Sequence, residues 1–322
     1  MLRAVRFCLM IEGQQGVTWK DWVALAETAE RSGFEGLFRS DHYFSGQGVT
    51  GRGSSDAWAL LGALATRTDR LRLGTLVSPV TFRSPGVLAR SALTVDEISG
   101  GRVEIGMGAG WWIEEHTQFG LPFPPAPERF AMLEEQLEIV HGLLNEDRFS
   151  FHGTHYTLQD AELLPKSTQE PHPPIILGGT QVGPWMQRLV GRWADEFNTV
   201  GGSPEHVRER FDRAREGAAA AGRDPDELVT SLMTWCFVGD TEEAYLARLA
   251  RAHAVDPTAG PFDVYRSEIE ADCIVGTPAR AAERLSEYAA AGVQRIMLNH
   301  ELFDDLEMLT LLATQVFPAV VG

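Results

Sequence analysis

The stretch that decides the fold is Gly100-Gly101-Arg102-Val103-Glu104-Ile105-Gly106-Met107-Gly108-Ala109-Gly110-Trp111-Trp112. It places a short buried strand directly before a glycine loop and two indoles. Glycine permits positive φ and removes the Cβ that would hold a ligand away, and consecutive amides form an anion-binding concavity. The G-x-G-x-G spacing lacks the third glycine and the helix start of a dinucleotide fingerprint. The segment alone leaves two interpretations open: a tight turn packed against the indoles, or a loop that approaches a cofactor closely.

The composition is that of an acidic protein with one large core. The chain has 322 residues, of which 44% are hydrophobic, and its formal net charge is -17. This charge argues against a nucleic-acid partner, because phosphate binding depends on clustered Lys and Arg. The three cysteines stand far apart, which disfavours disulfides and zinc. With no signal-peptide pattern and no apolar run of membrane-spanning length, we expect a cytoplasmic protein that does not contact a membrane.

Short apolar runs alternate with segments of helical period along the whole chain, a pattern typical of parallel strands joined by right-handed crossover helices. Helix-start signals occur at Thr18-x-x-Asp21, at Ser55-Asp56 and at Thr277-Pro278. Eight strands close a barrel, so we predict an α/β fold, a single (β/α)8 TIM barrel over residues 1–322. The predicted strands are 5–10, 36–39, 71–77, 103–106, 175–177, 196–199, 231–238 and 295–298.

Two insertions interrupt the alternation. Residues 147–174 contain an alternating stretch followed by a proline-rich tail, which predicts a hairpin after the fourth helix. Residues 254–272 have little period and contain Pro257, Gly260 and Pro261, which is typical of an irregular excursion beside the active face.

In a barrel of this kind, chemistry belongs at the carboxyl ends of the strands. His42 follows the second strand and is the sharpest candidate, because imidazole exchanges a proton near neutral pH, and Asp41 beside it would add an acceptor. The alternative is an ordinary histidine at a strand end. His300, after the last strand, is the second candidate, for a place in the substrate pocket. Neither an H-E-x-x-H motif nor clustered carboxylates indicate a catalytic metal.

A second glycine site follows the fifth strand. Gly178 and Gly179 precede a helix, and amides at a helix N-terminus hold phosphate without any lysine. The alternative is a strand-to-helix turn that needs glycine for its geometry. Residues 46–51 match G-x-G-x-x-G literally but stand apart from any strand and helix, so we interpret them as a flexible loop over the site.

Together these segments resemble the bacterial luciferase-like family, and the Ser-Asp-His ending of the second strand is similar to the branch that uses the deazaflavin coenzyme F420 in place of FMN. The resemblance covers nearly the whole chain. Its motifs are FRSDHY (38–43), LGTLVSPVTFRSP (73–85), DEISGGR (96–102), GAGW (108–111), PPIILGG (173–179) and ADEFN (194–198).

The resemblance implies a deazaflavin ring at the strand ends, against a bulge at Leu76-Val77 where the family often carries a non-prolyl cis peptide. His42 would be the proton donor or acceptor in hydride transfer, and the cofactor phosphate would lie near the glycine pair. The implied cofactor-binding residues are Asp41, Thr75, Leu76, Val77, Ala109, Gly110, Gly178, Gly179 and Asn198.

Two positions depart from the branch. Its sugar-phosphate and alcohol dehydrogenases place an acid where this chain has Trp111, and a tryptophan where it has Gly46. We therefore expect a small apolar or conjugated substrate stacked on Trp111, in a pocket that Gly46 and His300 complete. The alternatives are an FMN-dependent monooxygenase working with a flavin reductase, and a barrel without catalytic activity. The resemblance also implies a homodimer.

Overall fold

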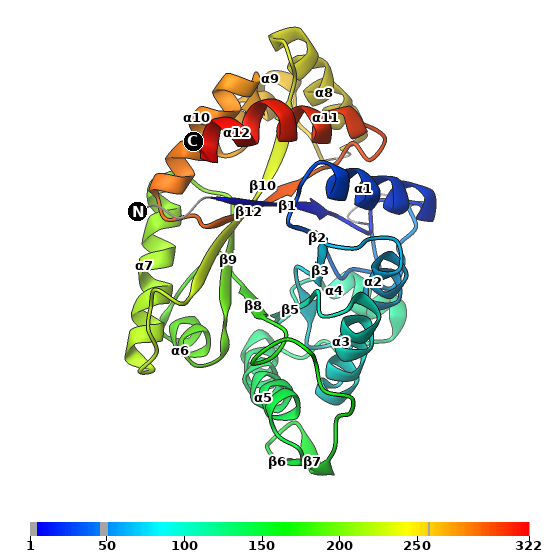
Figure 1. Cartoon of the computed structure of the whole chain (residues 1–322), viewed down its shortest axis with the longest axis vertical. Coiled ribbons are helices and arrows are strands. Elements are labelled where there is room, and N and C mark those ends of the chain that lie inside the picture. Colours follow the sequence, from blue (N-terminus) through cyan, green and yellow to red (C-terminus); the bar gives the residue numbers. More distant parts are fainter. Residues whose placement is uncertain (1–4, 46–50, 257, 322) are drawn as a thin grey trace.

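Eight parallel strands form a closed barrel in the computed structural model, which describes residues 5–45, 51–256 and 258–321 (Figure 1). The last barrel strand pairs with both the first and the seventh, which closes the ring and confirms the predicted TIM barrel. Two short strands, β4 (Ser78–Pro79) and β11 (Ile274–Gly276), pair in parallel with β5 and β10, respectively. The barrel strands are β1 (Arg6–Ile11), β2 (Gly36–Arg39), β3 (Arg72–Thr75), β5 (Val103–Gly108), β8 (Ile175–Gly178), β9 (Glu196–Val200), β10 (Val229–Val238) and β12 (Arg295–Asn299).

Helices surround this ring, and the predicted helix starts are confirmed. Thr18 caps α1 in a full capping box with Asp21, Asp56 caps α2, and Thr277 is the N-cap of α10 with Pro278 in its first turn. The helices are α1 (Trp19–Arg31), α2 (Ala57–Ala65), α3 (Pro85–Ser99), α4 (Ile113–Phe119), α5 (Ala126–Asn145), α6 (Pro184–Trp193), α7 (Pro204–Ala220), α8 (Glu242–Val255), α9 (Phe262–Asp272), α10 (Pro278–Ala290), α11 (Leu306–Leu311) and α12 (Phe317–Val321), with a π-helical turn, η1 (Leu312–Val316), between the last two.

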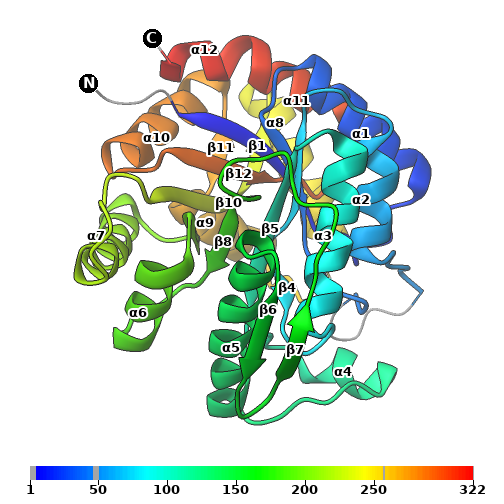
Figure 2. The same ribbon diagram turned by 60° about the horizontal axis from the view of Figure 1, so that its bottom comes forward.

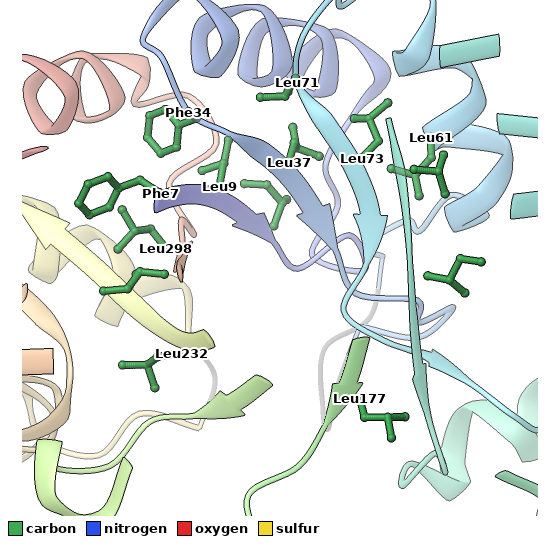
Figure 3. Close-up of a cluster of buried hydrophobic side chains, with 14 of the residues drawn as sticks. Phe7, Leu9, Phe34, Leu37, Leu61, Leu71, Leu73, Leu177, Leu232 and Leu298 are labelled. Atoms are coloured by element: carbon green, nitrogen blue, oxygen red, sulfur yellow. The ribbon is translucent and has the colours of Figure 1, made fainter. Parts of the chain in front are cut away.

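The core has two parts because successive strand residues point to opposite faces. Leu9, Leu37 and Leu298 point outward and pack between strands and helices (Figure 3). Inside the barrel, an apolar layer that includes Met10 and Met297 fills the centre. The barrel is therefore a packed core, and the site must lie above this layer at the carboxyl ends of the strands.

The first insertion forms the predicted hairpin. Strands β6 (Phe149–His152) and β7 (Thr157–Ala161) pair antiparallel, and the hairpin lies beside α5 (Figure 2).

The prediction of an irregular segment at 254–272 is wrong for most of its length, because α9 occupies Phe262–Asp272. Its Phe262, Tyr265 and Ile269 follow a helical spacing and pack against the buried cluster that contains Phe237. These three residues, spaced three and four positions apart, are easily missed between charged neighbours.

Candidate active site

The carboxyl end of β2 carries Asp41 and His42, but their side chains have different partners. Asp41 is buried, accepts a hydrogen bond from Ser78 Oγ at 2.6 Å, and forms an ion pair with Arg83 at 2.5 Å. The same guanidinium contacts Asp56 at 2.6 Å. Burial lowers the pKa of Arg83, but the Asp41 carboxylate outweighs it, and the pKa lies above its ordinary value. Asp41 therefore joins β2 to the β3–β4 segment, and the expectation that it would be the acceptor for His42 is wrong.

The acceptor for His42 is Glu115 in the first turn of α4. His42 Nδ1 lies 2.9 Å from Glu115 Oε1, and the other carboxylate oxygen accepts a hydrogen bond from the Tyr43 amide at 3.2 Å. Glu115 is only 1% exposed. Burial lowers the pKa of His42, but the hydrogen bond and charge of Glu115 outweigh burial, so the pKa lies above its ordinary value of 6.5. The pair therefore favours the imidazolium over the neutral imidazole.

Two indoles border this histidine. The Trp111 and Trp112 rings stack with centroids 5.0 Å apart and meet the His42 ring edge-on at 5.6 Å and 5.3 Å. Trp112 is buried, whereas Trp111 is 68% exposed. Trp111 therefore offers an open aromatic face beside the titratable ring.

The predicted cis peptide at Leu76-Val77 is confirmed, and it directly follows the end of β3 at Thr75. Thr75 is buried and donates to the Gly106 carbonyl at 3.1 Å. Val77 points toward the glycines of β5 and β8: an added Cβ at Gly108 would lie 2.6 Å from its Cγ2, and one at Gly178 would lie 3.4 Å from its Cγ1.

Because of this packing, the two interpretations of the glycine loop, a tight turn and a close approach to a cofactor, apply to different glycines. A Cβ at Gly106 would lie 1.9 Å from the Thr75 carbonyl oxygen, and one at Gly108 would contact Val77, so both glycines are required by the fold. Ala109 and Gly110 follow the strand and are partly exposed, and Gly110 has φ 76°. Close approach to a cofactor thus concerns only the last residues of the loop.

The second glycine site is less open than the sequence indicates. The Gly179 amide donates to the Asn198 carbonyl at 3.0 Å, and α6 begins five residues later, at Pro184. The amides at the N-terminus of α6 therefore belong to Trp185 and Met186, which have no helical acceptors. The expectation that Gly178 and Gly179 lie at the helix N-terminus is wrong, although β8 does end at Gly178, beside Val77.

Of the remaining predicted residues, the structure describes Asn198 and His300. Asn198 is buried inside the barrel and donates to Ser231 Oγ at 2.8 Å. His300 is buried near Asp305 and Arg248, and burial lowers its pKa to about 4. Gly46 lies outside the described residues.

A cavity of about 710 Å³ lies beyond β1 and β12 and was not anticipated from the sequence. Glu301 lines it and accepts a hydrogen bond from Trp235 Nε1 at 2.7 Å. Burial raises the pKa of Glu301 to about 7.

Sequence reasoning also missed Glu115 and Arg83. Glu115 stands beside the exposed Glu114, and nothing in the pattern separates the two carboxylates. Within the described residues, no group of three or more His, Cys, Asp or Glu side chains is placed to hold a metal ion. No helix in the described part of the chain is long and apolar enough to cross a membrane.

Comparison with known proteins identifies the class to which this barrel and site belong. The profile of the luciferase-like monooxygenase family matches residues 5–295, so the chain belongs to that family.

Particular relatives use two different cofactors. An F420-dependent glucose-6-phosphate dehydrogenase of Nakamurella multipartita is 32% identical, over 92% of this chain and 92% of that protein. An FMNH2-dependent dimethylsulfone monooxygenase of Pseudomonas putida is 30% identical, over 85% of this chain and 80% of that protein. Among solved structures, an F420-dependent secondary alcohol dehydrogenase in complex with an F420-acetone adduct shares the fold with a TM-score of 0.83 and 23% identity, covering 99% of this chain and 100% of that one.

Proposed function

We propose that the protein is an oxidoreductase that transfers a hydride between coenzyme F420 and a small apolar or conjugated organic substrate. The observation that carries the proposal is the contact between the part-buried His42 and the buried Glu115 at the carboxyl ends of the barrel strands. The similarity to F420-dependent dehydrogenases supports the choice of cofactor. A deazaflavin, when bound, carries a hydride and reacts poorly with oxygen, so it favours reduction or dehydrogenation over oxygenation.

The residues at the barrel mouth fit such a cofactor. They form a partly exposed surface without large polar side chains, which suits a planar ring. The amides of Trp185 and Met186, which have no acceptor within α6, suit a phosphate, since the positive end of a helix favours anions. The surface comprises Leu76, Val77, Ala109, Gly110, Gly178 and Gly179.

In the proposed reaction, His42 gives or takes the proton that accompanies the hydride. A substrate stacked on Trp111 would lie beside His42, because the two rings are 5.6 Å apart. The indole also replaces the acid expected in sugar-phosphate dehydrogenases of this branch, which disfavours a sugar phosphate. Burial of the substrate against the indole would supply orientation.

Cofactor titration is the direct test. Protein without cofactor is titrated separately with F420 and with FMN, and the proposal requires tighter binding of F420. The relative that uses FMNH2 makes an FMN-dependent monooxygenase the second candidate, which tighter FMN binding would establish. Binding of neither cofactor would support a barrel without catalytic activity.

The substrate class is tested by anaerobic mixing with reduced F420 and a panel of enones, imines and quinones, followed by absorbance. Replacement of Trp111 by Glu should weaken the reaction with apolar substrates. An unchanged substrate profile in that variant would contradict stacking on Trp111. Light scattering in solution tests the homodimer that belongs to the same proposal.

A further inference from the structure

The His42–Glu115 contact has a geometry that fixes which ring nitrogen faces the reaction. Glu115 lies 2.9 Å from Nδ1, and no described residue pairs with Nε2. A carboxylate only accepts hydrogen bonds, so Nδ1 must carry a proton in both the charged and the neutral imidazole. The proton that His42 exchanges is therefore the one on Nε2.

The carboxylate is itself held in place by its surroundings. Its second oxygen accepts from the Tyr43 amide, so a single buried group contacts both the His42 ring and the backbone after it. The next residue of α4, His116, lies between Thr81 Oγ1 at 2.6 Å and the Trp112 carbonyl at 2.6 Å. The first turn of α4 is thus bound on both sides, and Glu115 has little freedom to leave the histidine.

We propose that Glu115 is a positioning residue that holds His42 in the Nδ1–H form and directs Nε2 toward the substrate. This inference rests on the proposed function, because it assigns a second residue to the same reaction. Glu115 does not touch the substrate; it acts through the imidazole.

The proton and electron count is simple in the reducing direction. A bound, reduced deazaflavin would supply the hydride that forms a C–H bond at the substrate carbon, and the Nε2 proton of the imidazolium would go to the π electrons of the substrate double bond. The substrate would gain two electrons, which the cofactor would lose. Neutral His42 remains, with its Nδ1–H still on Glu115. In the reverse direction, the lone pair on Nε2 takes the substrate proton, so the same tautomer serves both directions.

The charged groups around His42 come from three elements. Glu115 belongs to α4, Glu12 follows β1, and Asp41 precedes the histidine in its own segment; all three are acidic, and Glu115 has the largest effect. Asp41 is already paired with Arg83. Removal of the Glu115 charge should therefore lower the pKa of His42 more than removal of any exposed carboxylate nearby.

The test is nuclear magnetic resonance of histidine-labelled protein without cofactor. In the wild-type protein, the ring nitrogen shifts of neutral His42 should report the Nδ1–H tautomer, and the titration should give a pKa above 6.5. Glu115→Gln should lower that pKa, whereas Glu114→Gln, which removes an exposed charge from the same turn, should leave it unchanged. Far-ultraviolet circular dichroism shows whether each variant is folded.

Kinetics supply the second readout. In the reducing direction, where His42 donates the proton, the alkaline limb of the pH profile of hydride transfer should move to lower pH with the His42 pKa in Glu115→Gln, with a loss of rate on the order of tenfold or more. An Nε2–H tautomer in the wild-type protein would overturn the proposal even if Glu115→Gln does not fold. An unchanged His42 titration in folded Glu115→Gln would do the same. Failure to bind F420 would refute the proposed function and leave the Glu115 result standing, so the two failures are distinguishable.

Discussion

At the residue scale, the site depends on one histidine whose acceptor comes from a distant part of the chain. His42 and Glu115 are 73 positions apart, and the carboxylate directly before the histidine faces Arg83 instead. The position of His42 was predictable because it follows a barrel strand. Its acceptor was not, because sequence adjacency does not determine where a side chain points after the strand ends.

The first prediction concerns His42 itself. His42→Asn keeps a polar group of similar size but cannot exchange the proton. The rate of hydride transfer should fall by about 10² to 10⁴, the range of general acid–base catalysis, while F420 binding remains near the wild-type value. Stopped-flow absorbance of reduced F420 and fluorescence titration measure the two quantities. A rate within threefold of the wild type would exclude His42 as the proton donor.

The second prediction concerns Glu301, whose pKa is raised to about 7 by burial. Because the folded-state pKa lies above the unfolded value of 4.5, the folded protein binds the Glu301 proton more tightly than the unfolded chain does. The stability that comes from this proton is fully present below pH 4.5 and is lost as the pH rises through 7. Glu301→Gln stays neutral and keeps an acceptor for Trp235. The variant should therefore gain about 1 to 3 kcal/mol of unfolding free energy at pH 8 and almost nothing at pH 4.5.

Urea unfolding at the two pH values measures this difference. Glu114→Gln, the loss of an exposed carboxylate, provides the control. If Glu301→Gln showed the same gain at both pH values, the raised pKa would be refuted.

At the element scale, the bulge after β3 and the glycines of β5 and β8 form one packing unit. Val77 lies against Gly108 and Gly178, and the Thr75 carbonyl lies against Gly106. The glycine loop was recognised from the sequence as important. The structural reason for its first two glycines was not, because Gly106 packs against the Thr75 carbonyl and Gly108 against Val77, and the orientation of that earlier segment follows from the fold.

The third prediction uses this unit in a double-mutant cycle. Gly108→Ala should cost about 1 to 3 kcal/mol of unfolding free energy, because the new Cβ would lie 2.6 Å from Val77 Cγ2. Val77→Ala removes that atom, so the double variant should lose less than the sum of the single variants. Gly106→Ala should show no such rescue, since its Cβ would meet the backbone oxygen of Thr75. Additive costs for Val77 and Gly108 in urea unfolding would contradict the packing.

The elements themselves were largely predictable. All eight barrel strands lie where the alternation of apolar runs predicts them, with ends displaced by one or two residues. Helix α9 was missed because only three apolar residues mark its buried side. The helix after β8 was predictable, but the placement of Gly178 and Gly179 at its N-terminus was wrong, because Gly178 ends β8 against Val77 and the Gly179 amide donates to the Asn198 carbonyl.

At the scale of the whole molecule, the two ends of the barrel interior differ in composition and role. The candidate site lies on one side of the layer that contains Met10 and Met297. On the other side of that layer, Arg295 contacts two carboxylates from other strands. Its guanidinium lies 2.6 Å from Glu104 and 2.9 Å from Glu196. The two carboxylates differ in the direction of their pKa shifts, although burial opposes the ionisation of both. At Glu104 the charge of Arg295 outweighs burial, and the pKa falls to about 2. At Glu196 burial dominates, and the pKa is raised.

The last prediction tests whether this polar layer holds the barrel together. Arg295→Met keeps most of the side-chain volume but leaves two buried carboxylates without their shared cation, so it should cost about 3 to 5 kcal/mol of unfolding free energy at pH 7. Arg6→Met provides the control, because Arg6 is exposed and forms a single ion pair with Glu35 at 2.8 Å, expected to contribute about 1 kcal/mol or less. Equal changes in the urea midpoint would show that burial gives Arg295 no special weight. A larger loss for Arg295→Met, with F420 affinity retained in the folded fraction, would show that the closed end stabilises the barrel independently of the site at its mouth.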